Sequence, residues 1–479
     1  MVLRVDNYES SVFIVPNLLQ NLLSYDVSIL KASMNFFQKN NFSSLLPSLN
    51  SQVWILASGR FLSNVGTGFT LFYAPIFFVN QVGLSATAVG WALGSASISG
   101  VVGRILGGAF SDSQFWGRRR TLLLSAAIAA IACFVLAITP DFTTLVIGNL
   151  LLGLGQGLYW PATEAVVADV TSTDQRREAY AVTRLADNLG LGMGIVFGGV
   201  LIGTTGAYRA LFILDGLSFL IFLAVVYFAI AETRPQENQT GAFAPGSWQI
   251  ALSDRSLLVF AIVNIIFTTY IAQLHSTLPL YLKNFVPVGS GGQGFTETTI
   301  SILFGWHMAM AIVTQLPVAR ALKRFTHPQA LTISALMWTL GFFCIWITGT
   351  VASGQITWAI LALSLLAIAT VAYTPSASAL ITDLAPPAQI GIYFSINSLC
   401  WAGGYFIGPP LGGWALDQSA AIADSFWLGS ALSVAIVVGI LQYLRRLLGS
   451  REQERAGSSG GTRRTRKTRK TRKTRGTGE

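Results

Sequence analysis

The segment TLLLSAAIAAIACFVLAIT, residues 121–139, contains no charged residue. As a helix rising 1.5 Å per residue it is about 28 Å long, close to the roughly 30 Å thickness of a bilayer's hydrocarbon core. In hydrocarbon every backbone N–H and C=O must be hydrogen-bonded within the protein, so a spanning segment is a helix or part of a closed barrel. The segment lacks the apolar/polar alternation of barrel strands. It therefore predicts a transmembrane helix.

Similar apolar segments recur along the chain. Of its 479 residues 52% are hydrophobic and only 11% are charged, against about 25% charged in soluble domains. The predicted fold class is an all-α integral membrane protein with twelve transmembrane helices. The predicted spans are 53–79, 87–110, 121–139, 142–168, 179–203, 207–231, 256–282, 298–322, 329–350, 355–382, 391–416 and 425–444.

The predicted spans form two related groups of six, separated by a long polar interruption. Three residues of the fourth span recur in the tenth at identical spacing: Tyr159, Pro161 and Asp169 match Tyr373, Pro375 and Asp383. Parallel repeats of this kind place a binding site near the midplane, between the halves. The expected organisation is an N-terminal cytoplasmic or membrane-surface segment (1–51), a first six-helix bundle (52–231), a central cytoplasmic loop (232–255), a second six-helix bundle (256–444) and a basic disordered tail (445–479).

The charges of the loops predict an orientation, because Lys and Arg resist translocation. The loops on one side hold Arg118, Arg119, Arg120, Arg176, Arg177, Arg234, Arg255, Arg320, Lys323 and Arg324, and those on the other side hold only Arg209 and Lys283. We therefore expect both termini in the cytoplasm and a location in the plasma (inner) membrane.

The tail accounts for the whole net charge of +10, because residues 445–479 carry 13 Lys or Arg against three Glu. Such a run of like charges is typical of a solvated segment. Contact with anionic lipid is the alternative, since the tail leaves the chain beside a membrane. We expect no nucleic-acid partner.

The sharpest local motif is GGAFSDSQFWGRRR, residues 107–120, after the second predicted span. It resembles the signature G-x-x-x-D-R-x-G-R-R of the major facilitator superfamily. The matching positions are Gly108, Asp112, Gly117, Arg118 and Arg119. Ser113 stands where the family often has Arg, and two extra residues separate Asp112 from Gly117.

The resemblance covers roughly residues 52–444 and is greatest to the multidrug and drug–proton antiporter branch. It implies two halves that alternate access to a central site, a small-molecule substrate and a coupling ion, with a proton expected. That branch often carries an Arg in the fourth helix, four residues before a Gly. Here that position is Asn149, before Gly153, which weakens the proton-antiport assignment but not the transporter assignment.

Charges around the motif are expected to form a conformational latch. Asp112 can pair with Arg118 or Arg119, and the resemblance implies Asp169 as a second acidic partner. Gly108 is expected to let the second helix approach a neighbour closely. A contact made in one conformation and broken in another biases the equilibrium by its difference in energy. The alternative is a solvated loop whose arginines only set orientation, because exposed ion pairs contribute about 0–1 kcal/mol.

Two glycine stripes at four-residue spacing predict closely packed helix faces. They are Gly190, Gly194 and Gly198 in the fifth span, and Gly404, Gly408 and Gly412 in the eleventh. Close, smooth contacts suit halves that rock, so these glycines need not touch substrate.

Ionisable residues inside the spans are candidate coupling sites, because each costs several kcal/mol in hydrocarbon unless paired or hydrated. The candidates are Arg60, Glu164, Arg184, Asp187, His275 and His307; Arg104 and Asp215 also lie within spans. Glu164 and Arg184 lie symmetrically about a turn and should meet, as a static pair or as a coupling site. The two histidines could bind protons near neutral pH or be merely hydrogen-bonded in the bundle.

Arg60 and Asp187 are expected to form an ion pair, because both lie about 10 Å deep from the same side of the membrane. Asp187 precedes Gly190 by three residues and so shares the packing face of the fifth helix. The resemblance implies that the first helix is the neighbour of that face. Protonation of Asp187 would free Arg60 for substrate or water, which makes this pair the preferred coupling site. A permanent structural bridge is the alternative.

The substrate is expected between the halves, near Arg60, Asp187 and the histidines. Further candidate cavity residues are Asn64, Gln273, Trp306 and Asn397. No metal or other cofactor is expected, because the three cysteines are scattered singly. No G-x-x-x-x-G-K-S/T loop for ATP is present, so an ion gradient is the expected energy source. We expect a monomer.

Three functions are open. The favoured one is a secondary active transporter for ion-gradient-driven efflux of amphipathic compounds, chosen over uptake by the resemblance alone. The second is uptake of a polar or anionic metabolite, which Arg60 could recognise. The third is a non-transporting membrane receptor or assembly platform. An enzyme is not expected, because no nucleophile–base pair appears.

Cysteine labelling tests the topology. The substitutions Gln81→Cys and Gln355→Cys should react with an impermeant reagent added outside intact cells, and Ser113→Cys only after permeabilisation. Labelling of Ser113→Cys from outside would overturn the predicted orientation.

Overall fold

The computed structural model describes residues 49–172, 175–233, 247–288, 292–386 and 389–473. The predicted N-terminal segment, 1–51, lies almost entirely outside the described residues. So do residues 234–246 of the predicted central loop.

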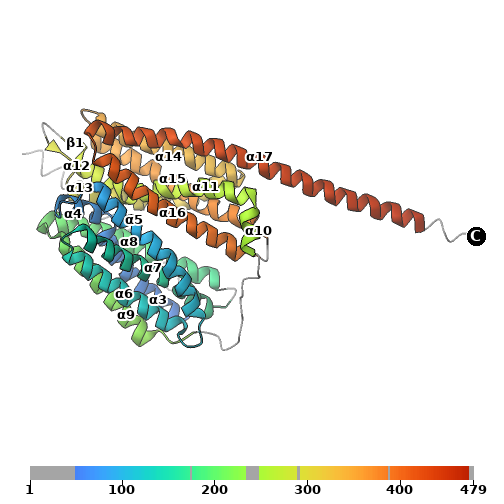
Figure 1. The fold of residues 1–479 in the computed structure, drawn as a ribbon, viewed down its shortest axis with the longest axis horizontal. Helices are drawn as coiled ribbons and strands as arrows, with labels where there is room; N and C mark the ends of the chain where they lie inside the picture. Colours follow the sequence, from blue (N-terminus) through green and yellow to red (C-terminus); the bar gives the residue numbers. More distant parts are fainter. Residues whose placement is uncertain (1–48, 173–174, 234–246, 289–291, 387–388, 474–479) are drawn as a thin grey trace, which may run out of the picture. The chain divides into compact units, whose positions relative to one another are not determined.

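The first half of the described chain is a group of seven helices, coloured blue to green in Figure 1. They are α3 (Ser51–Leu71), α4 (Tyr73–Asn80), α5 (Ala86–Asp112), α6 (Gly117–Ile138), α7 (Phe142–Asp169), α8 (Arg176–Thr205) and α9 (Tyr208–Ala229).

The second half follows, coloured yellow-green to red, with one small antiparallel pair of strands. Its elements are α10 (Ser247–Ser253), α11 (Arg255–His275), α12 (Thr277–Asn284), β1 (Pro287–Val288), β2 (Gly292–Gln293), α13 (Glu297–Leu322), α14 (His327–Thr350), α15 (Gln355–Leu384), α16 (Ile390–Leu416) and α17 (Ala420–Lys473).

Among the described residues, eleven helical segments are long and apolar enough to cross a membrane, with α3–α4 and α11–α12 each counted as one. α16 is a further helix of 27 residues, packed against α5 and α11. Together they account for the twelve predicted spans, with boundaries that shift by a few residues. The chain is a multi-pass, all-α membrane protein.

The first and seventh spans are each broken, which the predicted boundaries did not include. α3 gives way to α4 at Phe72, and α11 gives way to α12 at Ser276. Pro75 and Pro279 each follow the break by three residues. A proline lacks the N–H and clashes with the carbonyl four residues earlier, so it interrupts a helix. The same break in both halves extends the internal repeat.

The last helix departs from the prediction of a disordered tail, because α17 continues as helix to Lys473. Arg and Lys are good helix formers. Extending an existing helix also requires no new nucleus, which is the costly step of helix formation.

The predicted glycine stripes lie at close helix contacts. A Cβ added to Gly194 would lie 2.1 Å from the Val65 carbonyl oxygen of α3, and one on Gly404 would lie 2.1 Å from the Thr268 hydroxyl of α11. Gly190, Gly198, Gly408 and Gly412 also have close neighbours on α3, α4, α11 or α12. Thus α8 packs on the first span, and α16 packs on the seventh in the same way.

Gly108 does not have the predicted packing role, because a Cβ added there would meet nothing within 4 Å. The close approach of α5 to α7 is made one residue earlier. A Cβ on Gly107 would lie 2.8 Å from the Leu158 Cα and carbonyl oxygen. The side of α5 that faces α7 carries Gly103 and Gly107.

Adjacent substitutions test this assignment. Gly107→Ala should lower the thermal stability of the purified protein, because its Cβ collides with the backbone of α7. Gly108→Ala is the matched control. It should be neutral or stabilising by about 0.5–1 kcal/mol, the usual gain for Gly→Ala in a helix. Equal effects of the two changes on the melting temperature would contradict the packing described.

Candidate functional site

Arg60 of α3 and Asp187 of α8 form a bidentate ion pair inside the first half. Arg60 Nε donates to Asp187 Oδ1 at 3.0 Å, and Nη2 donates to Oδ2. Asn64 Nδ2 lies one turn along α3 and donates to Asp187 Oδ1 at 3.0 Å and to the Arg60 carbonyl oxygen at 2.9 Å. The predicted contact between Arg60 and Asp187 is therefore present, with one of the predicted cavity residues bound to it.

Glu164 of α7 extends this pair toward Arg184 of α8. Arg184 Nη2 lies 3.2 Å from Glu164 Oε1, and Arg60 Nη1 lies 3.8 Å from the same oxygen. Arg60 Nη1 also donates to the Thr163 hydroxyl at 3.4 Å. Four of the predicted coupling candidates thus form one charge cluster (Arg60, Glu164, Arg184 and Asp187) with two positive and two negative side chains.

Exposure increases across the charge cluster. The side chains of Arg60 and Asp187 are 0% and 10% exposed, whereas those of Glu164 and Arg184 are 29% and 58% exposed. A charged group facing hydrocarbon costs several kcal/mol. The exposed side chains of Glu164 and Arg184 therefore require contact with water rather than with lipid chains.

Aromatic rings stand beside the two arginines. The guanidinium carbons of Arg60 and Arg184 lie 5.5 Å and 5.2 Å from the centre of the Trp160 ring. Arg60 also lies 5.8 Å from the Tyr159 ring. Cation–π contacts of this length are attractive, so α7 contributes both a carboxylate and apolar surface to the site.

The second half presents hydrogen-bonded polar groups instead of a charge cluster. Asn264 of α11 donates to Asn397 Oδ1 of α16 at 2.7 Å, and the Tyr373 hydroxyl donates to Asn264 Oδ1. Trp306 Nε1 of α13 donates to the Ser364 hydroxyl at 2.8 Å. Gln273 is buried, and its Oε1 has no hydrogen-bond partner in the described structure.

The two predicted histidines lie apart from the charge cluster. His275 Nδ1 is 2.8 Å from the Tyr405 hydroxyl, and its ring meets Phe72 of the first half edge-on, with centroids 5.4 Å apart. His307 Nδ1 is 3.0 Å from the Leu363 carbonyl oxygen. Each ring has a neutral partner, as expected of hydrogen-bonded histidines in a bundle. Within the described residues, no group of three His, Cys, Asp or Glu could hold a metal ion.

At the motif, Arg118 lies between two carboxylates. It forms ion pairs with Asp112 and, at 3.2 Å, with Asp169. Arg119 is not part of this contact. Its guanidinium lies 5.3 Å from the Tyr227 ring and donates to the Tyr227 carbonyl oxygen. The predicted latch charges therefore meet through Arg118 alone, and all of them belong to the first half.

Glu232 completes this site and was missed by the sequence analysis, which placed it in the central loop. Its carboxylate accepts from Arg118 N at 2.9 Å and from Arg119 N at 3.1 Å. Gly117 has φ +75°, and a Cβ there would lie 2.4 Å from Glu232 Oε2. Glycine is therefore required at this turn. The signal available was an acidic residue just after the sixth span, on the same side as the motif.

The halves meet at the end of the bundle opposite Arg118. Asp417, after α16, accepts from the backbone N of Ala86 and of Thr87 at 2.8 Å. Asn80 and Asn284 exchange two hydrogen bonds of 2.9 Å. These contacts come from positions that carry no family signature, so the sequence analysis did not find them. They close the Asp417 end in this conformation.

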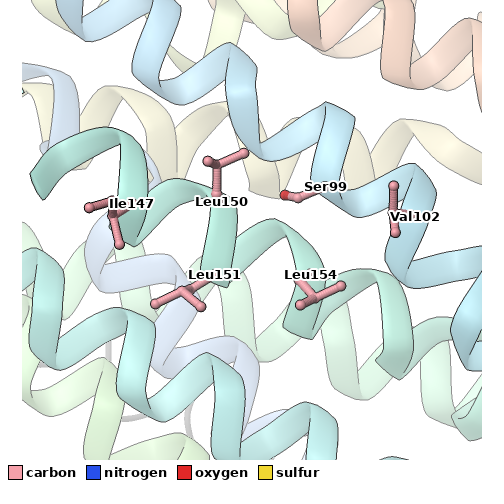
Figure 2. Close-up of a pocket in the computed structure, with 6 residues that line it drawn as sticks. All are labelled: Ser99, Val102, Ile147, Leu150, Leu151 and Leu154. Carbon is pink, nitrogen blue, oxygen red and sulfur yellow. The ribbon is translucent and has the colours of Figure 1, made fainter. Parts of the chain in front are cut away.

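A groove of about 390 Å³ lies on the side of the first half between α5 and α7 (Figure 2). Its lining residues are Ser99, Val102, Ile147, Leu150, Leu151 and Leu154. It has no ionisable group and is almost entirely apolar. Such a surface suits lipid chains rather than recognition of a polar substrate.

Residues 56–287 and 284–476 match the family model described as Major Facilitator Superfamily. The chain belongs to the major facilitator superfamily. It is 25% identical over 394 residues to a Na(+), Li(+), K(+)/H(+) antiporter of Planococcus maritimus, covering 76% of this chain and 90% of that relative. It is 24% identical over 376 residues to the multidrug resistance protein MdtH of Aeromonas hydrophila, covering 78% and 90%.

The solved structure of the nucleoside transporter NupG shares the fold, with a TM-score of 0.69 at 13% identity over 82% of this chain and 99% of that chain. Both relatives and this structural neighbour are transporters, so this member of the superfamily belongs with transporters and not with enzymes.

The substitution Asp112→Asn tests the latch. The Asp112 side chain is 77% exposed, so its ion pair contributes about 0–1 kcal/mol and the variant should fold and insert normally. Transport should nevertheless be abolished or strongly slowed, because Arg118 loses the partner on α5. Glu178→Gln, which removes an exposed carboxylate at the same end, is the control and should transport normally. Normal flux by a folded Asp112→Asn protein would reduce the motif to a topology signal.

Proposed function

We propose that this protein is a secondary active transporter of the plasma (inner) membrane that exports amphipathic compounds by alternating access. The energy source is an ion gradient, with a proton as the coupling ion. Both termini lie in the cytoplasm in this proposal, so the Arg118 end faces inward and the Asp417 end faces outward. The single observation that carries the proposal is the charge cluster of the first half, whose Arg60–Asp187 pair is buried.

The Arg60–Asp187 pair supplies a switch that a proton can operate. Breaking a buried ion pair by removing one partner costs about 3–5 kcal/mol. Protonation of Asp187 removes its charge, leaving Arg60 with only Glu164, 3.8 Å away, as a counter-charge. The net charge of the cluster then rises from zero to +1. A conformation in which Arg60 is hydrated or contacts substrate is then favoured, because reaching it no longer breaks an ion pair with Asp187.

The exposed side of the cluster supplies the connection to water. Glu164 contacts both the exposed Arg184 and the fully buried Arg60. It therefore links the exposed side of the charge cluster to the buried pair. The contacts of Asp417 and Asn80 join the halves at one end, and Arg104 of α5 donates to the Ser398 hydroxyl of α16 nearer the other end. Alternating access then requires the contacts at the Asp417 end to break when the outward-facing conformation forms.

The aromatic surface of α7 supports an amphipathic substrate. Trp160 and Tyr159 offer ring faces to an apolar group, while Glu164 and Arg184 offer hydrogen bonds to a polar one. The likeness to a multidrug resistance protein favours the same class, and the likeness to a cation/proton antiporter favours ion exchange.

Uptake of a polar or anionic metabolite is the second candidate function, and the exposure of Arg184 favours it. A guanidinium that is 58% exposed presents a planar set of N–H donors suited to a carboxylate. The direction of transport distinguishes export from uptake. Export predicts accumulation in inside-out vesicles when their lumen is acidified. Uptake predicts accumulation in right-side-out vesicles, and a receptor or platform predicts no flux in either.

A charge swap tests the coupling role of the pair. Arg60→Asp alone should lose folded protein, because it buries carboxylates without a cation. The double variant Arg60→Asp with Asp187→Arg should restore folding, since the ion pair is re-formed. Proton-driven transport should stay lost, because the titratable carboxylate now lies on α3. Recovery of both folding and proton-driven flux would show a purely structural bridge.

A further inference from the structure

Asp215 of α9 is a second buried carboxyl, and it has no cation beside it. The residue is 1% exposed. In the part of the chain that the structure describes, no Arg, Lys or His lies within ion-pair distance of it. Arg209, six residues earlier on α9, donates to the Ala137 carbonyl oxygen and lies over the Phe77 ring. An isolated carboxylate in such a place is very costly.

The groups that face Asp215 are neutral on every helix packed against it. Gly66 and Thr70 approach from α3, Cys133 from α6, and Ser218 from α9 itself. The thiol of Cys133 is the only titratable group among them. Ser218 already donates its hydroxyl hydrogen to the backbone carbonyl oxygen of Asp215 at 2.8 Å. No neighbour can therefore balance a negative charge on this carboxyl.

The hydrogen bonds of Thr70 indicate where a proton sits. The Thr70 hydroxyl oxygen lies 2.9 Å from Asp215 Oδ2 and 3.2 Å from the Thr67 carbonyl oxygen. A hydroxyl has one hydrogen, so it cannot donate to both acceptors at once. If Asp215 Oδ2 is protonated, it donates to Thr70, and Thr70 donates to Thr67. Both contacts are then hydrogen bonds.

The environment of Oδ1, the other side-chain oxygen of Asp215, also indicates a neutral, protonated carboxyl. Asp215 Oδ1 is buried and accepts no hydrogen bond from an N–H or O–H group in the described structure. An unsatisfied carbonyl oxygen of a neutral acid costs far less than an unsatisfied oxygen of an ion. A Cβ on Gly66 would lie 2.6 Å from Oδ1 and 2.0 Å from the Ser218 hydroxyl. Gly66 therefore packs directly against the carboxyl, and any side chain at this position would collide with it.

We propose that Asp215 is a proton-binding site, occupied in this conformation, that is separate from the Arg60–Asp187 pair. The bound proton joins α9 to α3 through Thr70, two residues before the break at Phe72. Arg60 lies ten residues away on α3, about 15 Å along the helix. The proton on Asp215 is enclosed by α3, α6 and α9, so it exchanges only when these helices separate.

Infrared spectroscopy of the purified protein at neutral pH tests the proposal. A solvent-exposed aspartate ionises at about pH 4, so a carbonyl stretch of a protonated carboxylic acid at neutral pH marks an unusual site. Wild type should show such a band, and Asp215→Asn should lose it. Asp141→Asn, which changes an exposed aspartate at the start of α7 to another good N-cap residue, is the control and should keep the band unchanged.

Two further variants keep the test decisive if Asp215→Asn does not fold. Asp215→Glu should move the band rather than abolish it, and Thr70→Val should shift it because the acid loses its acceptor. Absence of the band in wild type, or a band unaffected by every change at Asp215, would overturn the proposal. Loss of the wild-type band on adding sodium would show a metal ion in place of the proton. Because the readout is not transport, its failure leaves the role of Asp187 untouched.

Discussion

A guanidinium inside a membrane-spanning bundle must be paired, and the packing of the first half satisfies this requirement for Arg60. Asp187 pairs with it through both carboxylate oxygens, and it can do so only because α8 lies against α3 at backbone distance. Gly190 and Gly194 follow on the same face, where an added Cβ would lie 2.3 Å and 2.1 Å from the carbonyl oxygens of Phe61 and Val65. The glycine stripe and the ion pair are thus one packing unit, in which close approach of the helices makes the short charge contact possible.

The two ends of the bundle are held differently. At one end Asp417 and the Asn80–Asn284 pair join the halves. At the other end Arg118 joins Asp112 to Asp169 within the first half. The latch therefore does not tie the halves together directly. It fixes α5 relative to α6 and α7, and α5 is the helix that meets α16 of the second half. Its effect on alternating access would be transmitted through the position of α5.

The features predicted from sequence are those with a local or periodic signal. Apolar runs predict the spans, because membrane thickness sets their length. The ion pair between Arg60 and Asp187 was predicted because the two residues lie at equal depth in their helices. Contacts that depend on how the halves dock have no such signal, so Asp417 was not found. Gly108 shows the limit of a motif, since the neighbouring Gly107 makes the contact with α7. The break at Phe72 could have been predicted from Pro75. The contact of Glu232 with the backbone of Arg118 and Arg119 depends on the path of the chain after α9, which the sequence does not specify.

In the proposed mechanism, the protonation state of Asp187 sets the arrangement of the halves. Spin labels on Gln81→Cys and Gln418→Cys report the distance between the halves at the Asp417 end, which pulsed electron paramagnetic resonance measures. The native Cys133, Cys344 and Cys400 are buried and should stay unlabelled. Asp187→Asn removes the negative charge that protonation of Asp187 would remove, so the variant should populate a longer distance than wild type at the same pH. An Asp187→Asn protein whose distances match those of wild type would contradict this mechanism.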